Sequence, residues 1–278
     1  MRSPRSCPPR SGRPETAGRR RLDELLVERG LIASGAQAQA LLLAGRVRIG
    51  DRDAGARARP GDLVDPGIAL SLAPGRRYVS RGGEKLAGAL DAFLVSDPGV
   101  DPRDRVCLDV GASTGGFTDV LLQRGARRVY ALDVGRGQIA QAVRADPRVV
   151  VLESVNARHL AAAGPPGAPG AVLPEPVTLA TVDVSFISLE RILGPVTAMV
   201  SPGGGRIVAL VKPQFEASPA DAPRGVVRDV GVQRRVVQRI ADHAAGLGMI
   251  VRGEAESPLH GPAGNREFFL DLEVPARP

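Results

Sequence analysis

Apolar residues beyond about residue 81 fall into short runs that predict buried strands, and these runs alternate with longer stretches of helical period. The expected strands cover residues 106–110, 129–134, 149–153, 179–184, 206–211, 249–253 and 267–273. The expected helices cover residues 84–93, 116–124, 138–145, 189–199 and 231–246. Regular alternation of this kind predicts an α/β fold, with a mostly parallel sheet that has helices on both faces.

The N-terminal region has a shorter, more local pattern. Two short apolar stretches of helical period come first, and Ser34 is a suitable cap for the second of them. Residues 46–50 then alternate charged and apolar side chains, and residues 61–72 add turn and strand signals. We therefore expect a small α+β domain over residues 19–73.

The remaining segments are rich in proline, glycine and arginine. Residues 1–18 show no apolar period and are interpreted as a disordered leader. Residues 74–80 are interpreted as a linker, so that residues 81–278 form the second domain. Within that domain, residues 161–176 have the composition of a surface insertion.

Composition excludes several classes of protein. No apolar run approaches the roughly 20 residues that cross a bilayer, and the arginine-rich start lacks the apolar stretch of a signal peptide. We therefore expect a soluble, cytoplasmic protein. Only Cys7, Cys107 and three histidines occur in the chain, so we expect neither a disulfide framework nor a metal site.

The excess positive charge lies in the N-terminal part. Residues 1–81 carry 16 basic and 8 acidic side chains, whereas residues 82–278 carry 21 and 22, so the first part accounts for the net charge of +7. A basic domain joined to a nearly neutral one favours a unit that binds a polyanion, with a solvated basic tail as the alternative. Aromatic residues are only 3% of the chain, so phosphate contacts by arginine are favoured over stacking on bases.

Lysine is almost absent. Of the 37 basic residues, only Lys85 and Lys212 are lysines. Lysine, unlike arginine, can give up its proton when it is desolvated or lies beside another cation. The two positions that retain lysine are therefore candidates for proton transfer, with chance retention as the alternative.

A glycine-rich turn follows the first expected strand of the second domain. After Asp109 and Val110 the chain reads Gly111-Ala112-Ser113-Thr114-Gly115-Gly116-Phe117 and continues as a helix. Doubly wound sheets bind nucleotides at such turns, where glycine lets a ligand approach the backbone. Asp133 ends the second strand, about 22 residues past the first glycine, where an acid suits the hydroxyls of an adenosine ribose. The pattern favours an S-adenosylmethionine pocket, with Asp109 at the amino-acid end of the cofactor, in contact with it directly or through water.

Two other interpretations of this turn compete with the first. Ser113 stands where the dinucleotide fingerprint G-x-G-x-x-G has its second glycine, so that fingerprint is not matched. The same residues do match the G-x-S-x-G nucleophile elbow of hydrolases. The three histidines, His159, His243 and His260, lie in polar, irregular or helix-end contexts that do not suit the base of a catalytic triad.

Four charged residues are expected near the glycine-rich turn. Asp183 ends the fourth strand, Lys212 follows the fifth, Glu267 opens the last, and Lys85 lies on the helix that enters the domain. The carboxyl ends of parallel strands lie at one edge of a sheet, so a fold of this kind can bring these residues together. An ordinary surface salt bridge is the alternative for each residue taken alone.

Five strings of residues resemble the TlyA family of S-adenosylmethionine-dependent ribosomal RNA 2′-O-methyltransferases, whose members are also named haemolysins. They are Arg81-Gly82-Gly83-Glu84-Lys85-Leu86, Asp109-Val110-Gly111-Ala112-Ser113-Thr114-Gly115-Gly116-Phe117-Thr118-Asp119, Asp183-Val184-Ser185-Phe186-Ile187-Ser188-Leu189, Leu210-Val211-Lys212-Pro213-Gln214-Phe215-Glu216 and Gly264-Asn265-Arg266-Glu267-Phe268-Phe269. The resemblance implies an FtsJ-like, seven-stranded, Rossmann-like domain and cytidine 2′-hydroxyls of 16S or 23S ribosomal RNA as targets.

The resemblance also implies roles for individual residues. Lys85, Asp183, Lys212 and Glu267 would form a catalytic tetrad in which Lys212 accepts the hydroxyl proton and the two acids orient the lysines and the hydroxyl. The expected cofactor ligands are Asp109, Gly111, Ala112, Ser113, Thr114, Gly115, Gly116, Phe117 and Asp133.

In the N-terminal domain, Arg21-Leu22-Asp23, Leu26-Val27-Glu28-Arg29-Gly30-Leu31 and Ala44-Gly45-Arg46-Val47-Arg48 resemble the αL RNA-binding motif found in a small-subunit ribosomal protein, pseudouridine synthases and tyrosyl-tRNA synthetases. The resemblance implies phosphate contacts by Arg19, Arg20, Arg21, Arg46 and Arg48. Two alternatives of other classes are a ribosome assembly factor with an inactive methyltransferase fold and a pore-forming haemolysin. The intact tetrad argues against the first, and the sequence lacks the membrane-spanning or strongly amphipathic cationic segment that the second needs.

Overall fold

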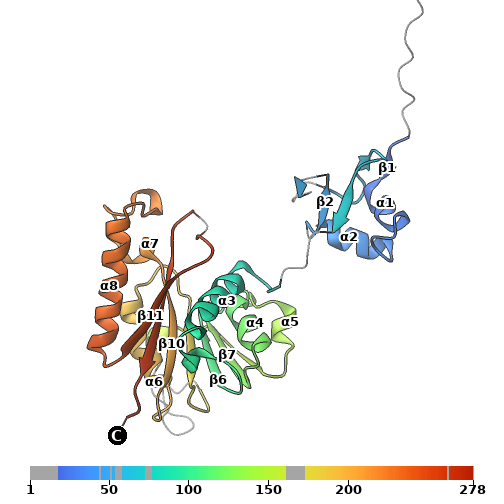
Figure 1. The fold of residues 1–278 in the computed structure, drawn as a ribbon. Coiled ribbons are helices and arrows are strands. Elements are labelled where there is room, and N and C mark those ends of the chain that lie inside the picture. Colours follow the sequence, from blue (N-terminus) through green and yellow to red (C-terminus); the bar gives the residue numbers. More distant parts are fainter. Residues whose placement is uncertain are drawn as a thin grey trace, which may run out of the picture. The chain divides into compact units, whose positions relative to one another are not determined.

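The computed structural model describes residues 18–43, 45–50, 52–53, 58–72, 77–160, 173–261 and 263–277. The chain divides into two compact units, Met1–Gly75 and Arg76–Pro278, which Figure 1 shows in blue to cyan and in teal to red. Parts of three expected segments lie outside the described residues: the leader up to residue 17, residues 74–76 of the linker and residues 161–172 of the insertion.

The first unit combines two helices with short antiparallel strands. Strands β2 (Val47–Ile49), β3 (Arg52–Asp53) and β5 (Leu70–Leu72) form a sheet in the order β3-β2-β5, and β1 (Arg20–Arg21) pairs with β4 (Leu63–Val64). Helices α1 (Leu22–Glu28) and α2 (Gly35–Leu43) supply most of its small apolar core. The N–H of Gln37 donates to Ser34 Oγ at 3.3 Å, which confirms the expected cap of the second helix.

The second unit contains a seven-stranded sheet in the order β11-β12-β10-β9-β6-β7-β8. Six strands run in one direction, and β12 is antiparallel to both of its neighbours, β10 and β11. The strands are β6 (Val106–Val110), β7 (Arg128–Asp133), β8 (Val149–Glu153), β9 (Leu179–Val182), β10 (Gly205–Val211), β11 (Ile250–Glu256) and β12 (Phe268–Val274). The mostly parallel α/β sheet predicted from the apolar pattern is confirmed.

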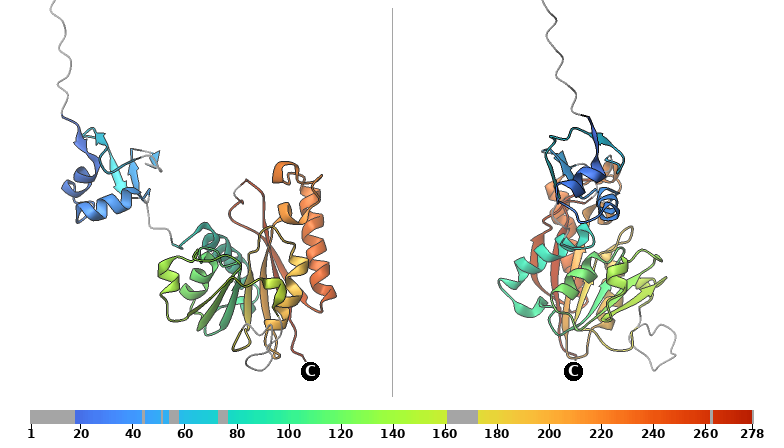
Figure 2. Two further views of the ribbon diagram at one scale, coloured as in Figure 1. Left: turned by 180° about the vertical axis from the view of Figure 1, so that it is seen from behind. Right: turned by 90° about the vertical axis from the view of Figure 1, so that its right-hand side faces the viewer.

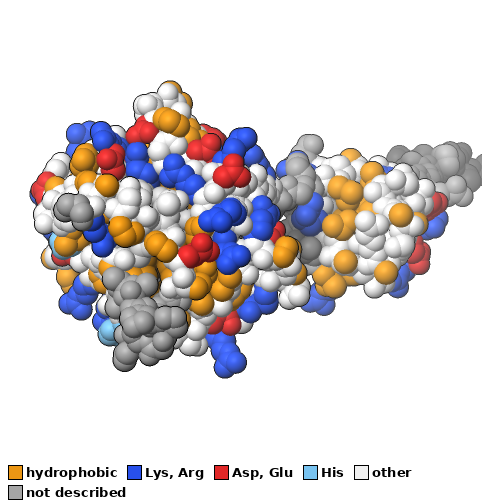
Figure 3. Space-filling view, turned by 90° about the horizontal axis from the view of Figure 1, so that it is seen from below, with side chains coloured by type: hydrophobic (Ala, Val, Ile, Leu, Met, Phe, Trp, Pro, Cys, Tyr) orange, Lys and Arg blue, Asp and Glu red, His pale blue; other side chains and the backbone are white. Residues whose placement is uncertain are grey.

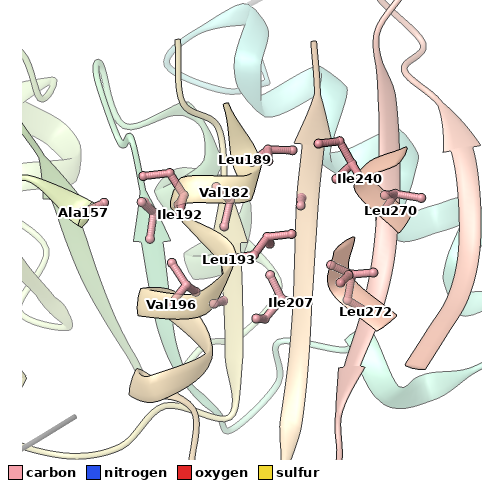
Figure 4. Packing of buried hydrophobic residues seen from close by; sticks show 14 of the residues in the cluster. Ala157, Val182, Leu189, Ile192, Leu193, Val196, Ile207, Ile240, Leu270 and Leu272 are labelled. Atoms are coloured by element: carbon pink, nitrogen blue, oxygen red, sulfur yellow. The ribbon is translucent and has the colours of Figure 1, made fainter. Parts of the chain in front are cut away.

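Helices cover both faces of this sheet (Figure 2). They are α3 (Arg81–Leu94), α4 (Gly116–Gln123), α5 (Gln141–Arg144), α6 (Leu193–Met199), α7 (Pro213–Glu216) and α8 (Val230–Gly246), with 3₁₀ turns η2 (Pro98–Val100), η3 (Ala157–His159), η4 (Leu189–Arg191) and η5 (Pro223–Gly225). Alternate strand residues face two separate apolar cores. In Figure 4, Leu193 and Val196 of α6 pack on Val182 and Ile207 of the sheet. Among the described residues, no helix is long and apolar enough to span a membrane.

Two expected helices differ from those observed. The helix predicted over residues 138–145 begins only at Gln141, because Gly137 has a left-handed φ of 70° and Ala140 is extended. The helix predicted over residues 189–199 is divided into η4 and α6. Pro195 has no N–H to donate to the preceding turn, so a continuous helix would lose a hydrogen bond there, whereas proline is tolerated in the first turn of α6.

Candidate active site

The glycine-rich turn leads from β6 into α4 at the carboxyl edge of the sheet. Gly111 and Gly115 have left-handed φ angles of 84° and 90°, which residues with a Cβ atom rarely adopt. A Cβ atom on Gly111 would collide with the carbonyl oxygen of Asp183, and one on Gly116 would collide with Oγ of Ser80. The turn therefore requires glycine, because the backbones at the end of β9 and the start of α3 approach it so closely.

Two cavities of about 230 and 400 Å³ open beside this turn, and both are lined by Gly111, Ser113 and Asp183. The smaller one is also lined by Ser80, Arg81, Gly82, Lys85, Ala112, Thr114, Gly116, Phe117 and His260. The larger one is more apolar and is lined by Val110, Leu132, Asp133, Val134, Gln138, Val155, Asn156, Ala157, Val184, Ser185, Phe186, Ile187 and Ile192. Together they form a space with a charged, polar end and an apolar end.

Asp133 lies at the apolar end and holds the glycine-rich turn. Its Oδ2 accepts from the backbone N–H of Ser113 at 2.7 Å, and its Oδ1 accepts from that of Gly135 at 2.6 Å. Each carboxylate oxygen can accept two hydrogen bonds, so capacity for ligand hydroxyls remains. Ser113 Oγ donates to Gln138 Oε1 at 3.3 Å, so the contact that a nucleophile elbow needs with histidine is replaced by an amide.

Asp109 lines neither cavity, so the cavities do not support a direct contact with the cofactor, and the contact through water stays a prediction. Its side chain is fully buried and accepts hydrogen bonds from Thr118 Oγ1 at 2.6 Å and Thr181 Oγ1 at 3.1 Å. Burial raises the pKa of this carboxyl to about 7, although both hydroxyls act in the opposite direction. Asp109 therefore connects the strand before the glycine-rich turn to Thr118 of α4 and Thr181 of β9.

The four residues of the expected tetrad meet as two ion pairs. Lys85 Nζ lies 2.5 Å from Glu267 Oε2, and Lys212 Nζ lies 2.5 Å from Asp183 Oδ1. Besides this ion pair, Lys212 Nζ donates a hydrogen bond to Ser185 Oγ at 2.9 Å. The carboxylates differ in access, since the Glu267 side chain is 1% exposed and that of Asp183 is 22% exposed. Lys85 and Asp183 line the same cavity, so the two pairs belong to one site.

Helix α7, which the apolar pattern did not predict, adds two residues to this site. Gln214 Nε2 donates to Glu267 Oε1 at 3.0 Å. Glu216 is buried, and its carboxylate accepts from Ser188 Oγ and from the backbone N–H of Leu189, both at 2.7 Å. The sequence signals Gln214 and Glu216 only by their position in the same string as Lys212, two and four residues after it.

The similarity of the whole chain to known proteins identifies its family. Residues 78–273 match the model of the FtsJ-like methyltransferase family. The chain is 46% identical over 261 residues to the 16S/23S rRNA (cytidine-2′-O)-methyltransferase TlyA of Mycobacterium tuberculosis, which covers 93% of this chain and 91% of that protein. The chain belongs to the TlyA family of FtsJ-like methyltransferases. The resemblance inferred from the five strings is thus confirmed.

Other members of the TlyA family carry different names. Hemolysin A of Brachyspira hyodysenteriae is 34% identical over 255 residues, which are 91% of this chain and 100% of that protein. A solved structure from Streptococcus thermophilus that carries the name hemolysin is 38% identical, has a TM-score of 0.67 and covers 94% of this chain and 90% of that one. The family's shared fold therefore extends over nearly the whole chain.

The two cavities fit S-adenosylmethionine, the cofactor of the family's methyltransferase chemistry. The methionine portion of the cofactor carries both an ammonium and a carboxylate, which suit the end lined by the charged residues Arg81, Lys85 and Asp183. The adenosine suits the apolar end, which Asp133 also lines. Gly111 lines both cavities and has no side chain, so its backbone can be approached closely by a ligand there. The chain's residues are thus suited to hold this cofactor.

The arginines expected to bind RNA lie in the first unit. Arg19, Arg20 and Arg21 precede α1, and Arg46 and Arg48 lie next to or within β2. Arg20 pairs with Glu28 at 3.1 Å, and Arg21 pairs with Asp23 at 2.8 Å, so these two guanidinium groups already have acidic partners. Figure 3 shows one face of the molecule, on which basic side chains lie among acidic and apolar ones.

Proposed function

We propose that this chain transfers a methyl group from S-adenosylmethionine to the 2′-hydroxyl of a cytidine in 16S or 23S ribosomal RNA. The observation that carries the proposal is the 2.5 Å ion pair between Lys212 and Asp183 beside the glycine-rich turn. The names of the family members with known activity support the same reaction and substrate. We infer from this substrate that the protein acts in the cytoplasm.

The residues of the site have two tasks. S-adenosylmethionine, when bound, supplies a methyl group that is already activated by its positive sulfur. A ribose hydroxyl is a poor nucleophile at neutral pH, so the protein must orient it and take up one proton. We assign Lys212 as the acceptor of this proton, and Asp183, whose Oδ1 lies 2.5 Å from Nζ, stabilises the ammonium that results. An arginine at this position could carry the charge but could not act as the base.

Lys85 and Glu267 orient the substrate. Lys85 donates to Glu267 and lines the cavity, so its remaining protons can be directed at ribose oxygens. Glu267 is buried and holds the ammonium of Lys85 in place. We assign Lys85 and Glu267 to alignment of the ribose and Lys212 with Asp183 to the proton transfer.

We further propose that the first unit docks structured RNA through Arg19, Arg20, Arg21, Arg46 and Arg48. Phosphate contacts release counterions, so RNA affinity should fall steeply as salt rises. The basic excess of residues 1–81 supports this assignment.

Transfer of labelled methyl from S-adenosylmethionine to separated ribosomal subunits and to free ribosomal RNA tests the function. We expect label from the natural protein and at least about 100-fold less from Lys212→Arg, because a general base contributes about 10²- to 10⁴-fold. Arg235→Lys, a matched exchange on the exposed side of α8, should retain full activity. Equal transfer by the natural protein and Lys212→Arg would exclude Lys212 as the base. Tight RNA binding without any label would favour the assembly factor.

A further inference from the structure

Glu267 receives one donor on each carboxylate oxygen. Its Oε2 accepts from Lys85 Nζ at 2.5 Å, and its Oε1 accepts from Gln214 Nε2 at 3.0 Å. The residue is 1% exposed, so it depends on protein donors for its hydrogen bonds. A Cβ atom on Gly261 would lie only 2.5 Å from Oε1, which shows how closely the backbone confines this oxygen. The orientation of Glu267 is therefore defined by Lys85, Gln214 and Gly261.

The remaining side chains around α7 contact the loop after β9. Lys212, directly before the helix, contacts Asp183 and Ser185. The rings of Phe215 and Phe186 lie 4.8 Å apart. Within the part of the chain that the structure describes, Gln214 thus provides a hydrogen bond from the segment that begins at Lys212 to the Lys85–Glu267 pair.

We propose that Gln214 is a positioning residue for methyl transfer, which fixes the Lys85–Glu267 pair relative to Lys212. This inference rests on the proposed function, because it assigns the two ion pairs to one reaction. The neutral amide suits the position, since it donates to a buried carboxylate without adding a second negative charge. The Oε1 atom of Gln214 is buried and lacks a hydrogen-bond partner among the described residues. A buried oxygen without a hydrogen-bond partner lowers the stability of the fold. The hydrogen bond from Nε2 to Glu267 therefore explains the presence of glutamine at this position better than a contribution to stability does.

Two substitutions at this position distinguish positioning from a merely structural role. Gln214→Leu keeps a similar size but cannot donate to Glu267. Gln214→Glu can donate only while its carboxyl is protonated, and two carboxylates about 3 Å apart share a proton more readily at low pH. Gln238→Leu and Gln238→Glu, on the exposed side of α8, are matched controls.

The measurements are kcat and KM for ribosomal RNA across pH, the dissociation constant of S-adenosylmethionine by calorimetry, and the melting temperature. We expect kcat of Gln214→Leu to fall about 10- to 100-fold at every pH, the range expected when a hydrogen bond to a charged group is lost. Cofactor affinity should change less than about threefold, because Gln214 is absent from the residues that line the two cavities. The ratio of Gln214→Glu activity to that of the natural protein should fall as pH rises, with near-complete recovery at the acidic end.

The activity ratio separates the new carboxyl from the other titratable groups at the site. These are Arg81 and Lys85 of α3, Asp183 after β9, Lys212 after β10, Glu216 of α7, Arg239 of α8, Glu267 before β12, and His260. They are present in both proteins, so a pH-dependent ratio reports the group introduced at residue 214. Undiminished kcat in Gln214→Leu, or a ratio for Gln214→Glu that does not vary with pH, would overturn the positioning role. Failure of the natural protein to transfer methyl would instead overturn the proposed function.

Discussion

Glu216 accepts a hydrogen bond from the backbone N–H of Leu189 at 2.7 Å and thereby joins the turn after β10 to the loop after β9. Ser188 Oγ donates to the same carboxylate at 2.7 Å. The two joined segments carry Lys212 and Asp183, whose 2.5 Å ion pair is assigned to the proton transfer in the proposed reaction. A buried carboxylate outside the tetrad therefore helps to set the distance between two members of it.

Replacement of Glu216 by alanine should destabilise the protein and lower kcat. Loss of this carboxylate leaves the Leu189 N–H and the Ser188 hydroxyl without their acceptor, at a cost of about 1–3 kcal/mol for a buried polar group left unpaired. Glu216→Gln should cost less, because burial raises the pKa of Glu216 and a neutral amide avoids the desolvation of a charge. Denaturant unfolding of both variants tests this order. Equal stability of Glu216→Ala and the natural protein would contradict it.

Asp109 should make the stability of the second unit depend on pH. Burial raises the pKa of its carboxyl from 3.8 to about 7, so between these values the folded protein binds more protons than the unfolded chain does. Its contribution to stability is therefore complete below about pH 4 and is lost as pH rises through about 7, with a slope of at most about 1.4 kcal/mol per pH unit.

The variant Asp109→Asn isolates this contribution. An amide cannot ionise. The free energy of unfolding should therefore decline less steeply between about pH 4 and 7, by at most the slope that one bound proton contributes, about 1.4 kcal/mol per pH unit. Thermal unfolding over this pH range, compared between the two proteins, provides the measurement. An identical slope in both would show that other groups cause the decline.

Gly111→Ala should weaken cofactor binding. The added Cβ atom would collide with the Asp183 carbonyl, and the φ angle of 84° is strained for alanine. We expect the dissociation constant of S-adenosylmethionine to rise at least about tenfold, which is equivalent to a loss of about 1.4 kcal/mol of binding free energy. Gly246→Ala, at a helical position where a Cβ atom meets open space, is the control and should bind normally. Calorimetry would contradict the prediction if both variants bound alike.

The double variant Arg46→Ala and Arg48→Ala should weaken RNA binding and leave cofactor binding unchanged. If each arginine contacts one phosphate, the slope of log affinity against log salt should shrink by about 0.7–0.9 per contact. Filter binding at several salt concentrations measures this slope, and calorimetry with S-adenosylmethionine provides the control. An unchanged salt slope would place the RNA-binding surface elsewhere.

The apolar pattern was sufficient to predict the seven strands and their mostly parallel arrangement. It failed where local backbone chemistry competes with periodicity, as at Gly137 and Pro195. It also missed α7, since a single turn of four residues is too short for a helical period to be visible. The lysine count selected Lys85 and Lys212 for chemistry, and the structure places each of them in an ion pair at one site.

The sequence by itself determined which residue types were available for chemistry and that most of them would follow strands of one sheet. Only the tertiary structure decided their partners. Lys85 pairs with Glu267, 182 positions away, because the strand order sets β12 beside β10, and no local pattern encodes strand order. Burial was decided in the same way, since Asp109 and Asp133 both follow apolar runs, yet Asp109 lies under the turn and Asp133 lines the cavity.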